Sequence, residues 1–147
     1  MAADHNGVAA KATLAAWLGV RGHEVDDRGV HDEHETVDYP PLCVGLCRRL
    51  LDGNADRGVV IGGAGGGEMI VCNRLAGIRA ALGQTPEVAR ISRANNDSNV
   101  LVLGAKVLDL QMMQQILEVW LSTDFSGGRH QQRLDQIAAL ERGEPLD

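Results

Sequence analysis

Short apolar runs alternate with longer amphipathic segments along almost the whole chain. Residues 57–61 and 100–103 have the length and composition of buried strands, whereas 108–121 carries its apolar residues at helical spacing. Strands that alternate with helices form a parallel sheet, and the helices then cover both of its faces. The sequence therefore predicts an α/β fold with a parallel sheet between two layers of helices.

The same periodicities predict where each element lies. Thr85 and Pro86 mark the start of one helix, since threonine is a good helix cap and proline fits the first turn. Helices are expected at 8–20, 41–51, 68–75, 86–94, 108–121 and 128–141, and strands at 24–25, 57–61, 78–82 and 100–103. A chain of 147 residues suits one domain, 1–147, of which 143–147 is expected to be a flexible tail.

Charge, hydropathy and cysteine content argue against several classes of protein. The net charge of -6 at pH 7 disfavours a nucleic-acid partner, because such binding depends on a basic surface. No apolar run approaches the ~20 residues that a membrane-spanning helix needs. Three cysteines with no secretory segment before them fit a reduced compartment, and we expect the cytoplasm. Cys43 and Cys47 are spaced to share one helix face, and core packing is favoured over a metal site.

The glycine run 62–67 lies between an expected strand and an expected helix. Backbone N–H groups at such a turn point outward without partners, and they can hold an anion or a developing oxyanion. The run is not a Walker loop, because no Gly-Lys-Ser/Thr follows it, and no acidic residue stands at the spacing of a dinucleotide site. Glu68 closes the run. From spacing alone, interaction with the helix dipole is the simpler explanation of this carboxylate.

Three loops are expected to meet at the carboxyl ends of the strands, where ligands bind in such sheets. They are residues 4–7, 62–68 and 95–99. Arg129 and Arg133 are spaced by one helical turn at the start of the last helix, so they share a face and can grip a phosphate. Taken alone, these arginines are better explained by a solvated basic face.

Eight segments of the chain, taken together, carry a family resemblance. They are 3–7, 21–25, 37–40, 55–58, 62–73, 77–82, 96–104 and 127–133. The set resembles the family of ribose-5-phosphate isomerase B and galactose-6-phosphate isomerase, in the family's order and at its spacing. The resemblance covers nearly the whole chain.

The resemblance implies a Rossmann-like three-layer α/β sandwich and a homodimer, or a dimer of dimers, with active sites shared between subunits. It implies neither a metal nor another cofactor. The chemistry is proton transfer between C1 and C2 of an open-chain sugar phosphate through a cis-enediolate. The reaction favoured is the interconversion of ribose 5-phosphate and ribulose 5-phosphate, a step of the pentose phosphate pathway.

The resemblance also implies roles for single residues. Many members use a cysteine at the first position of the glycine turn, which is Gly63 here, and a second group uses a glutamate at the turn's end, which Glu68 matches. Glu68 is therefore the predicted base. The turn residues expected to bind the enediolate oxygens are Gly63, Ala64, Gly65 and Gly67. The predicted substrate-binding residues are Asp4, His5, Tyr39, Asn96, Lys106, Arg129, His130 and Arg133.

Several positions depart from the family pattern. The family usually has a ring-opening histidine at the position of Asn95, a serine or threonine at that of Ala64 and an arginine at that of Lys106. Asn95 belongs to the predicted catalytic set by position, although an amide does not exchange protons near neutral pH. The family also has a longer strand before Asp4 than residues 1–3 provide, so either the start is misassigned or that strand is absent.

Asn95 keeps two other functions open. A tetrose 4-phosphate, such as erythrose 4-phosphate, cannot close a furanose ring because its O4 is esterified, so its isomerase needs no ring-opening histidine. The other function is that of a non-catalytic partner subunit that binds a sugar phosphate. Glu68 argues against this second alternative, since a subunit without catalysis has no reason to keep a base.

Overall fold

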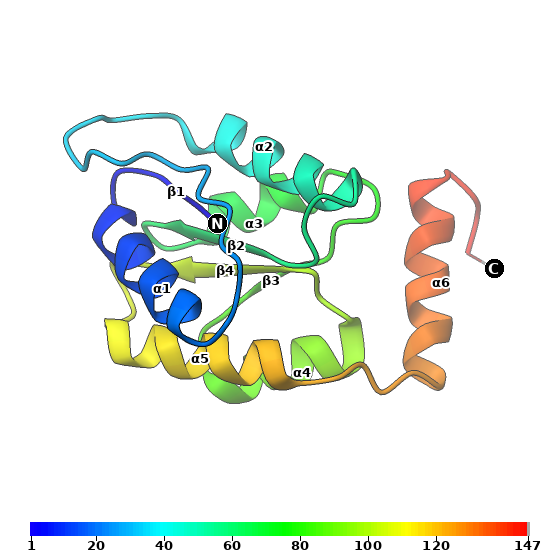
Figure 1. The fold of residues 1–147 in the computed structure, drawn as a ribbon. Coiled ribbons are helices and arrows are strands. Elements are labelled where there is room, and N and C mark those ends of the chain that lie inside the picture. Colours follow the sequence, from blue (N-terminus) through cyan, green and yellow to red (C-terminus); the bar gives the residue numbers. More distant parts are fainter. Residues whose placement is uncertain (147) are drawn as a thin grey trace.

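The computed structural model describes residues 1–146, and within them four parallel strands form one sheet in the order β1-β2-β4-β3 (Figure 1). The strands are β1 (Ala2–Ala3), β2 (Gly58–Gly62), β3 (Ala80–Leu82) and β4 (Val100–Gly104). The helices are α1 (Val8–Val20), α2 (Tyr39–Leu51), α3 (Gly66–Cys72), α4 (Pro86–Asn96), α5 (Leu110–Ser122) and α6 (Arg129–Glu141). The predicted α/β fold is confirmed.

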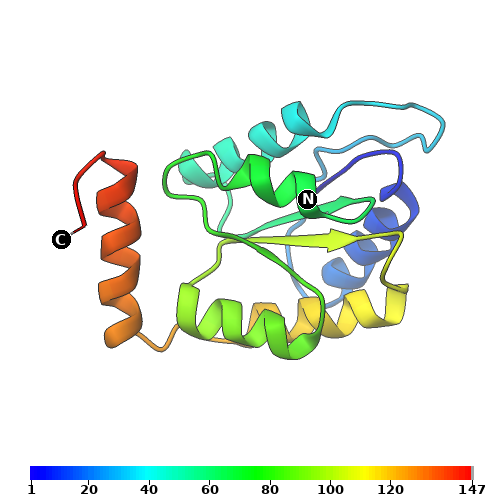
Figure 2. The same ribbon diagram turned by 180° about the vertical axis from the view of Figure 1, so that it is seen from behind.

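The two faces of the sheet carry separate apolar cores, because successive side chains of a strand point to opposite faces. Ile61 and Leu103 pack with α1, α4 and α5, whereas Val60 and Val102 pack with α2 and α3. Figures 1 and 2 show α2 and α3 on one side of the sheet and α4 and α5 on the other. The central strands β2 and β4 are therefore buried on both faces, which explains their continuous apolar sequences.

The three cysteines belong to the core on the α2–α3 side. Cys43, Cys47 and Cys72 are free thiols, and all three are buried. The hydrogen bond with Cys43, followed by burial, raises the pKa of the Cys72 thiol to about 12. The predicted packing of Cys43 and Cys47 in the core is thus confirmed.

The predicted strand at 24–25 is wrong. The chain instead runs beside β1 over residues 26–30, where Arg28 N donates to Met1 O over 2.8 Å and Val30 N donates to Ala3 O over 3.2 Å. With only two residues, β1 is too short a partner for a regular strand ladder. An ion pair between Lys11 and Asp27 holds this segment against α1 instead.

Several element ends differ from the predicted ones by a few residues. The helix expected to begin at Pro41 begins at Tyr39, because prolines are tolerated in a first turn whose N–H groups have no helical partners. The helix α3 begins at Gly66, before Glu68, and ends at Cys72. Thr85 caps α4 as predicted, since its hydroxyl accepts a hydrogen bond from Val88 N over 3.2 Å. Residue 147, the last of the expected tail, lies outside the described residues.

The helix α6 lies apart from the layered body, at one end of the molecule (Figures 1 and 2). None of its residues is buried, and its apolar Ile137 and Leu140 are 42% and 56% exposed. Glu141, at its end, accepts a hydrogen bond from Gly77 N over 3.0 Å. Within residues 1–146, no helix combines the length and the hydropathy required to cross a bilayer.

Candidate active site

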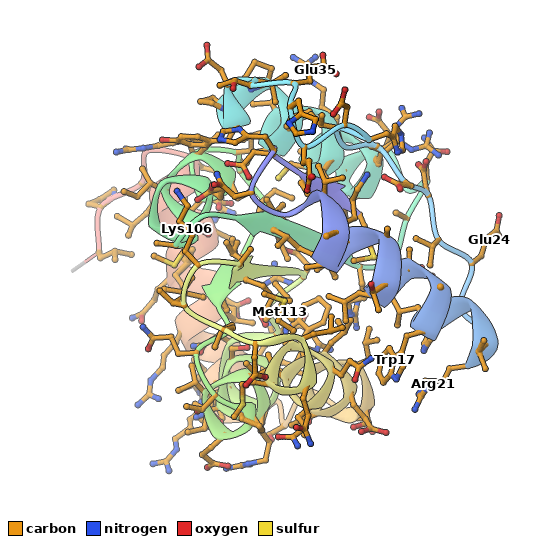
Figure 3. The ribbon with its side chains drawn as sticks, turned by 90° about the vertical axis from the view of Figure 1, so that its left-hand side faces the viewer. Trp17, Arg21, Glu24, Glu35, Lys106 and Met113 are labelled. Atoms are coloured by element: carbon orange, nitrogen blue, oxygen red, sulfur yellow. The ribbon has the colours of Figure 1, made fainter. Side chains whose placement is uncertain are left out.

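The glycine turn lies at the carboxyl end of β2, where the strand passes into α3. Gly65 has φ +85°, a left-handed conformation that glycine adopts without steric cost. Two hydrogen bonds tie the turn to the chain after β4: Ala105 N donates to Gly62 O and Lys106 N donates to Gly63 O, both over 2.8 Å. The turn is therefore held between the ends of the two central strands, at the side of the molecule that faces the viewer in Figure 3.

The amides of this turn are available to a ligand. Among the described residues, no hydrogen bond is donated by the N–H groups of Gly63, Ala64 or Gly65. The turn also immediately precedes the amino end of α3, where the helix dipole favours negative charge. This arrangement suits an anionic oxygen.

Glu68 stands in the first turn of α3 and is 5% exposed. Its carboxylate folds back over the last residue of β2, so that a Cβ built at Gly62 would overlap Oε1 and lie 3.0 Å from Oε2. No ion pair of Glu68 is present within residues 1–146. The structure thus holds a nearly buried carboxylate against Gly62, the residue at which the glycine turn begins.

Tyr39 reaches the same turn from the start of α2. A Cβ built at Gly67 would lie 2.5 Å from the Tyr39 hydroxyl oxygen, so the phenol rests directly on the backbone of α3. Only glycine at position 67 leaves room for it. The structure thus places Tyr39, a predicted binding residue, against Gly67, which immediately precedes Glu68 in α3.

The loop after β1 supplies polar groups to the site. Asp4, 7% exposed, accepts hydrogen bonds from the backbone N and from Nδ2 of Asn6, each over 2.9 Å. The Nε2 atom of His5 lies 3.3 Å from Asn6 Nδ2, and His5 Nδ1 is buried without a partner among the described residues. Asp4 therefore fixes the loop conformation, and His5 keeps an unused ring nitrogen.

Asn6 is a site residue that the sequence prediction missed. A Cβ built at Gly63 would lie 3.6 Å from Asn6 Nδ2 and 3.5 Å from Lys106 Cδ. Asn6 and Lys106 thus flank the glycine turn from two different loops. The signal available in the sequence was the place of Asn6 in the loop 4–7, one of the three expected to line the crevice.

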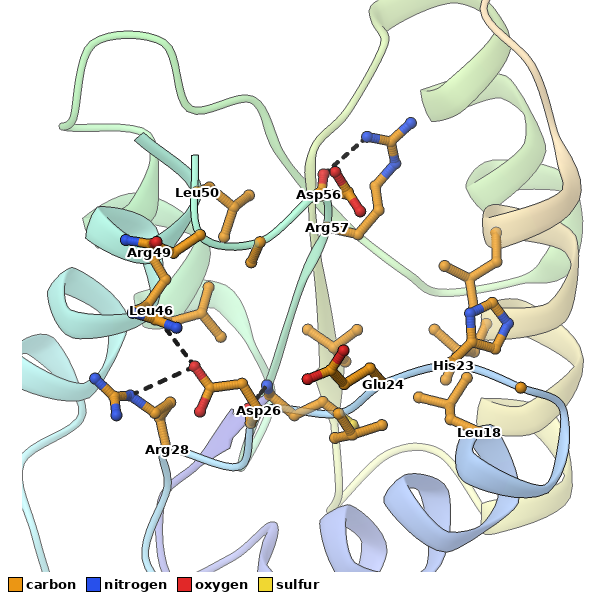
Figure 4. A pocket seen from close by; sticks show the side chains of 18 residues that line it. Leu18, His23, Glu24, Asp26, Arg28, Leu46, Arg49, Leu50, Asp56 and Arg57 are labelled. Atoms are coloured by element: carbon orange, nitrogen blue, oxygen red, sulfur yellow. Dashed lines mark hydrogen bonds and ion pairs between the residues drawn. The ribbon is translucent and has the colours of Figure 1, made fainter. Parts of the chain in front are cut away.

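Two cavities lie at opposite ends of the sheet. One, of about 410 Å³, adjoins the glycine turn at Ala64, Gly104 and Val107, and its volume lies in the range of small-molecule sites. The other, of about 770 Å³, lies at the amino end of β2 (Figure 4). Its Asp26 is already paired with Arg49 over 2.9 Å and with Arg28 over 3.8 Å. Only the smaller cavity includes a residue of the glycine turn, Ala64, and Glu68 lines neither of the two.

The expectation that residues 95–99 join this crevice is wrong. The helix α4 runs back toward the amino ends of the strands, so Asn95 and Asn96 lie at the opposite end of the strands from Glu68. Asn99 lies at these amino ends as well, since its backbone carbonyl accepts a hydrogen bond over 2.9 Å from the N–H of Gly58, the first residue of β2. The arrow of β4 points away from α6, which lies at the same edge as the end of α4 (Figure 1).

The predicted site residues therefore form two groups in one chain. The group around the glycine turn comprises Asp4, His5, Tyr39, Gly63, Ala64, Gly65, Gly67, Glu68 and Lys106. The group on the side of the strands' amino ends comprises Asn95, Asn96, Arg129, His130 and Arg133. In the second group Arg129 and Arg133 are exposed, and neither forms an ion pair with another residue of the described chain. Over residues 1–146, no group of His, Cys, Asp and Glu side chains is arranged to hold a metal ion.

Comparison with known proteins finds close relatives over nearly the full length. The family model of Ribose/Galactose Isomerase matches residues 1–137. Ribose-5-phosphate isomerase B of Escherichia coli (strain K12) is 40% identical over 139 residues, which are 95% of this chain and 93% of that protein.

Solved structures give the same relationship. Ribose-5-phosphate isomerase B of Clostridium thermocellum superposes with a TM-score of 0.94 at 40% identity, covering 97% of this chain and 95% of that one. The Mycoplasma genitalium ribose-5-phosphate isomerase B, whose structure holds bound ribulose-5-phosphate, gives a TM-score of 0.91 at 29% identity over 96% of this chain and 93% of that one.

Proposed function

Because the chain belongs to the ribose/galactose isomerase family, and is thus an aldose–ketose isomerase, we propose that it interconverts ribose 5-phosphate and ribulose 5-phosphate. The substrate named for the similar proteins of Escherichia coli and Clostridium thermocellum supports this choice. The observation that carries the proposal is the 5% exposed Glu68 carboxylate, held against the glycine turn whose amides have no partners. A coupled assay of ribulose 5-phosphate formation from ribose 5-phosphate tests it, and no turnover would refute it.

Glu68 is proposed as the base that moves the proton. Its carboxylate takes the C2 proton of the open-chain aldose, and the electron pair forms the C1–C2 double bond of the enediolate. The proton of the O2 hydroxyl moves to O1, and Glu68 returns its proton to C1 to give the ketose. A positioned base contributes roughly 10²–10⁴ in rate. Burial of Glu68 limits the water around its carboxylate, and this strengthens the electrostatic interactions of that group.

The amides of the turn are proposed to bind the enediolate oxygens. Gly63, Ala64, Gly65 and Gly67 belong to this set, and an oxyanion gains most from donors that are already in place. Lys106, on the neighbouring loop, supplies a positive charge near the same oxygens or the phosphate. Its ammonium lacks the planar fork of an arginine, so it acts as a point charge.

A shared site in a homodimer, or in a dimer of dimers, is the second part of the proposal. The cations suited to the phosphate, Arg129 and Arg133, lie at the opposite edge of the sheet from Glu68 in the same chain. The helix α6 that carries them has no buried residue and exposes Ile137 and Leu140. A second copy that docks this helix beside the first copy's glycine turn would unite the two groups.

Complementation between inactive variants tests the shared site. Glu68→Gln and Arg133→Ala each disable one half, so each homodimer is inactive. After unfolding and refolding together at equal amounts, half of the dimers are mixed and each mixed dimer has one intact site. We expect about a quarter of the wild-type activity from random pairing. No recovery, with dimers confirmed by light scattering, would place each complete site within one chain.

Asn95 supports a second candidate substrate, a tetrose 4-phosphate such as erythrose 4-phosphate. An asparagine cannot act as the acid that opens a sugar ring, and a tetrose 4-phosphate has no furanose ring to open. Side-by-side assays of ribose 5-phosphate and erythrose 4-phosphate separate the two. Faster turnover of ribose 5-phosphate eliminates the tetrose candidate. A cytoplasmic location stays a prediction, supported by the three free thiols.

A further inference from the structure

Gly62 is the last residue of β2 and faces the carboxylate of Glu68. A Cβ built on it would overlap both Oε1 and Cδ of Glu68 and would lie 3.0 Å from Oε2. The carboxylate thus lies in the space that a side chain at position 62 would take. No other glycine of the described chain has the Glu68 carboxylate among its nearest atoms.

The backbone does not explain a glycine at this position. Gly62 is a strand residue in register with Gly104 of β4, and its φ lies outside the left-handed region that favours glycine. Gly65, by contrast, has φ +85° and is required by the turn itself. An alanine at position 62 would displace the nearby carboxylate, whereas the backbone of the strand could accept the alanine.

We propose that Gly62 is a positioning residue for the base: its missing side chain leaves the space in which the Glu68 carboxylate is held. This rests on the proposed role of Glu68. It also revises the expectation for Gly63, where an added Cβ would meet Lys106 and Asn6 only at ordinary distances of 3.5 and 3.6 Å. Position 62, not position 63, is where a side chain and the carboxylate exclude one another.

A methyl group at position 62 is expected to lower activity without destabilising the fold. The atoms that must move belong to the end of a flexible side chain, and rotation about its bonds relieves the overlap. At Gly7 the situation is different, because an added Cβ would lie 2.6 Å from the backbone carbonyl oxygen of Ile61. A displacement of about 1 Å in a catalytic group costs on the order of 10² in rate.

The test compares Gly62→Ala with Gly45→Ala, the same substitution at an α2 position where an added Cβ meets nothing within 4 Å. We expect Gly62→Ala to lower kcat about 10²-fold, with KM and the melting temperature close to those of the wild type. Gly45→Ala should leave kcat and KM unchanged and should not lower the melting temperature, because alanine is favoured over glycine inside a helix. Full kcat in Gly62→Ala would overturn the inference.

A second pair of variants distinguishes positioning from a general structural effect. In a Glu68→Ala background the carboxylate is gone, so adding Gly62→Ala should lower the residual rate of C2 proton exchange no further. A further loss of equal size would show that position 62 acts independently of Glu68 and would contradict the inference. A different result would refute the proposed role of Glu68: the wild-type rate of proton exchange in the single variant Glu68→Ala.

Discussion

The ion pair between Lys11 and Asp27 gives a prediction about what holds the site's first loop in place. Lys11 lies on α1 with its side chain 1% exposed, and Asp27 lies in the segment beside β1, the strand that leads into Asp4. Burial alone would raise the pKa of Asp27, but the hydrogen bonds from Lys11 and Gly29 outweigh it and lower that pKa. The carboxylate is therefore charged at neutral pH and pairs with the ammonium.

Asp27→Asn should destabilise the protein substantially at pH 7. It leaves the Lys11 ammonium buried without its counter-charge, and such losses cost about 3–5 kcal/mol.

Urea unfolding at pH 7 measures this loss as the difference in the free energy of unfolding between the wild type and Asp27→Asn. The variant Lys11→Met/Asp27→Asn is the control, because it removes both charges and keeps the volume, and it should recover most of the loss. In the wild type the pair's contribution is present above the unfolded pKa of Asp27, near 3.9, and is lost as the pH falls through the lowered folded pKa. A deficit below about 1 kcal/mol at pH 7, typical of surface pairs, would refute the reasoning.

Three further variants or probes test other contacts. Trp120→Phe removes the hydrogen bond from Nε1 to Ser98 Oγ, 2.8 Å long in a buried site, and should lower the free energy of unfolding by about 1–3 kcal/mol; an unchanged urea midpoint would contradict this. Lys106→Met should raise KM for the sugar phosphate by about 10-fold or more, from loss of a charged hydrogen bond, with kcat less affected; an unchanged KM would remove Lys106 from binding. Cys72, buried and with a pKa of about 12, should resist a disulfide-exchange reagent at pH 8 until urea unfolds the chain; labelling of the folded protein within seconds would contradict its burial.

The central part of the fold was predictable because its causes are local. The buried strands β2 and β4 are continuous apolar runs, and the cap at Thr85 uses a side chain three residues from the N–H that it binds. The strand predicted at 24–25 failed for a non-local reason. The residues that follow it run beside β1, which has two residues, and the sequence of 24–25 contains no information about that length.

The candidate site was predictable in its residues but not in its geometry. Glu68 and the glycine turn share one loop, so sequence spacing alone brings them together. The separation of Asn95 and Arg129 from that turn depends on the direction in which α4 returns along the sheet. The contact between Gly62 and the Glu68 carboxylate depends on a side-chain conformation, which no spacing rule gives.

Proton exchange at C2 of the substrate tests most directly that Glu68 is the base. With ribose 5-phosphate deuterated at C2, the wild type should release the label into water during turnover. Glu68→Gln keeps the size of the side chain and removes its basicity, so the rate of release should fall at least about 10²-fold, while the dissociation constant for the sugar phosphate stays within about threefold, since uniform binding is retained. Release at the wild-type rate by Glu68→Gln would contradict the assignment of the base.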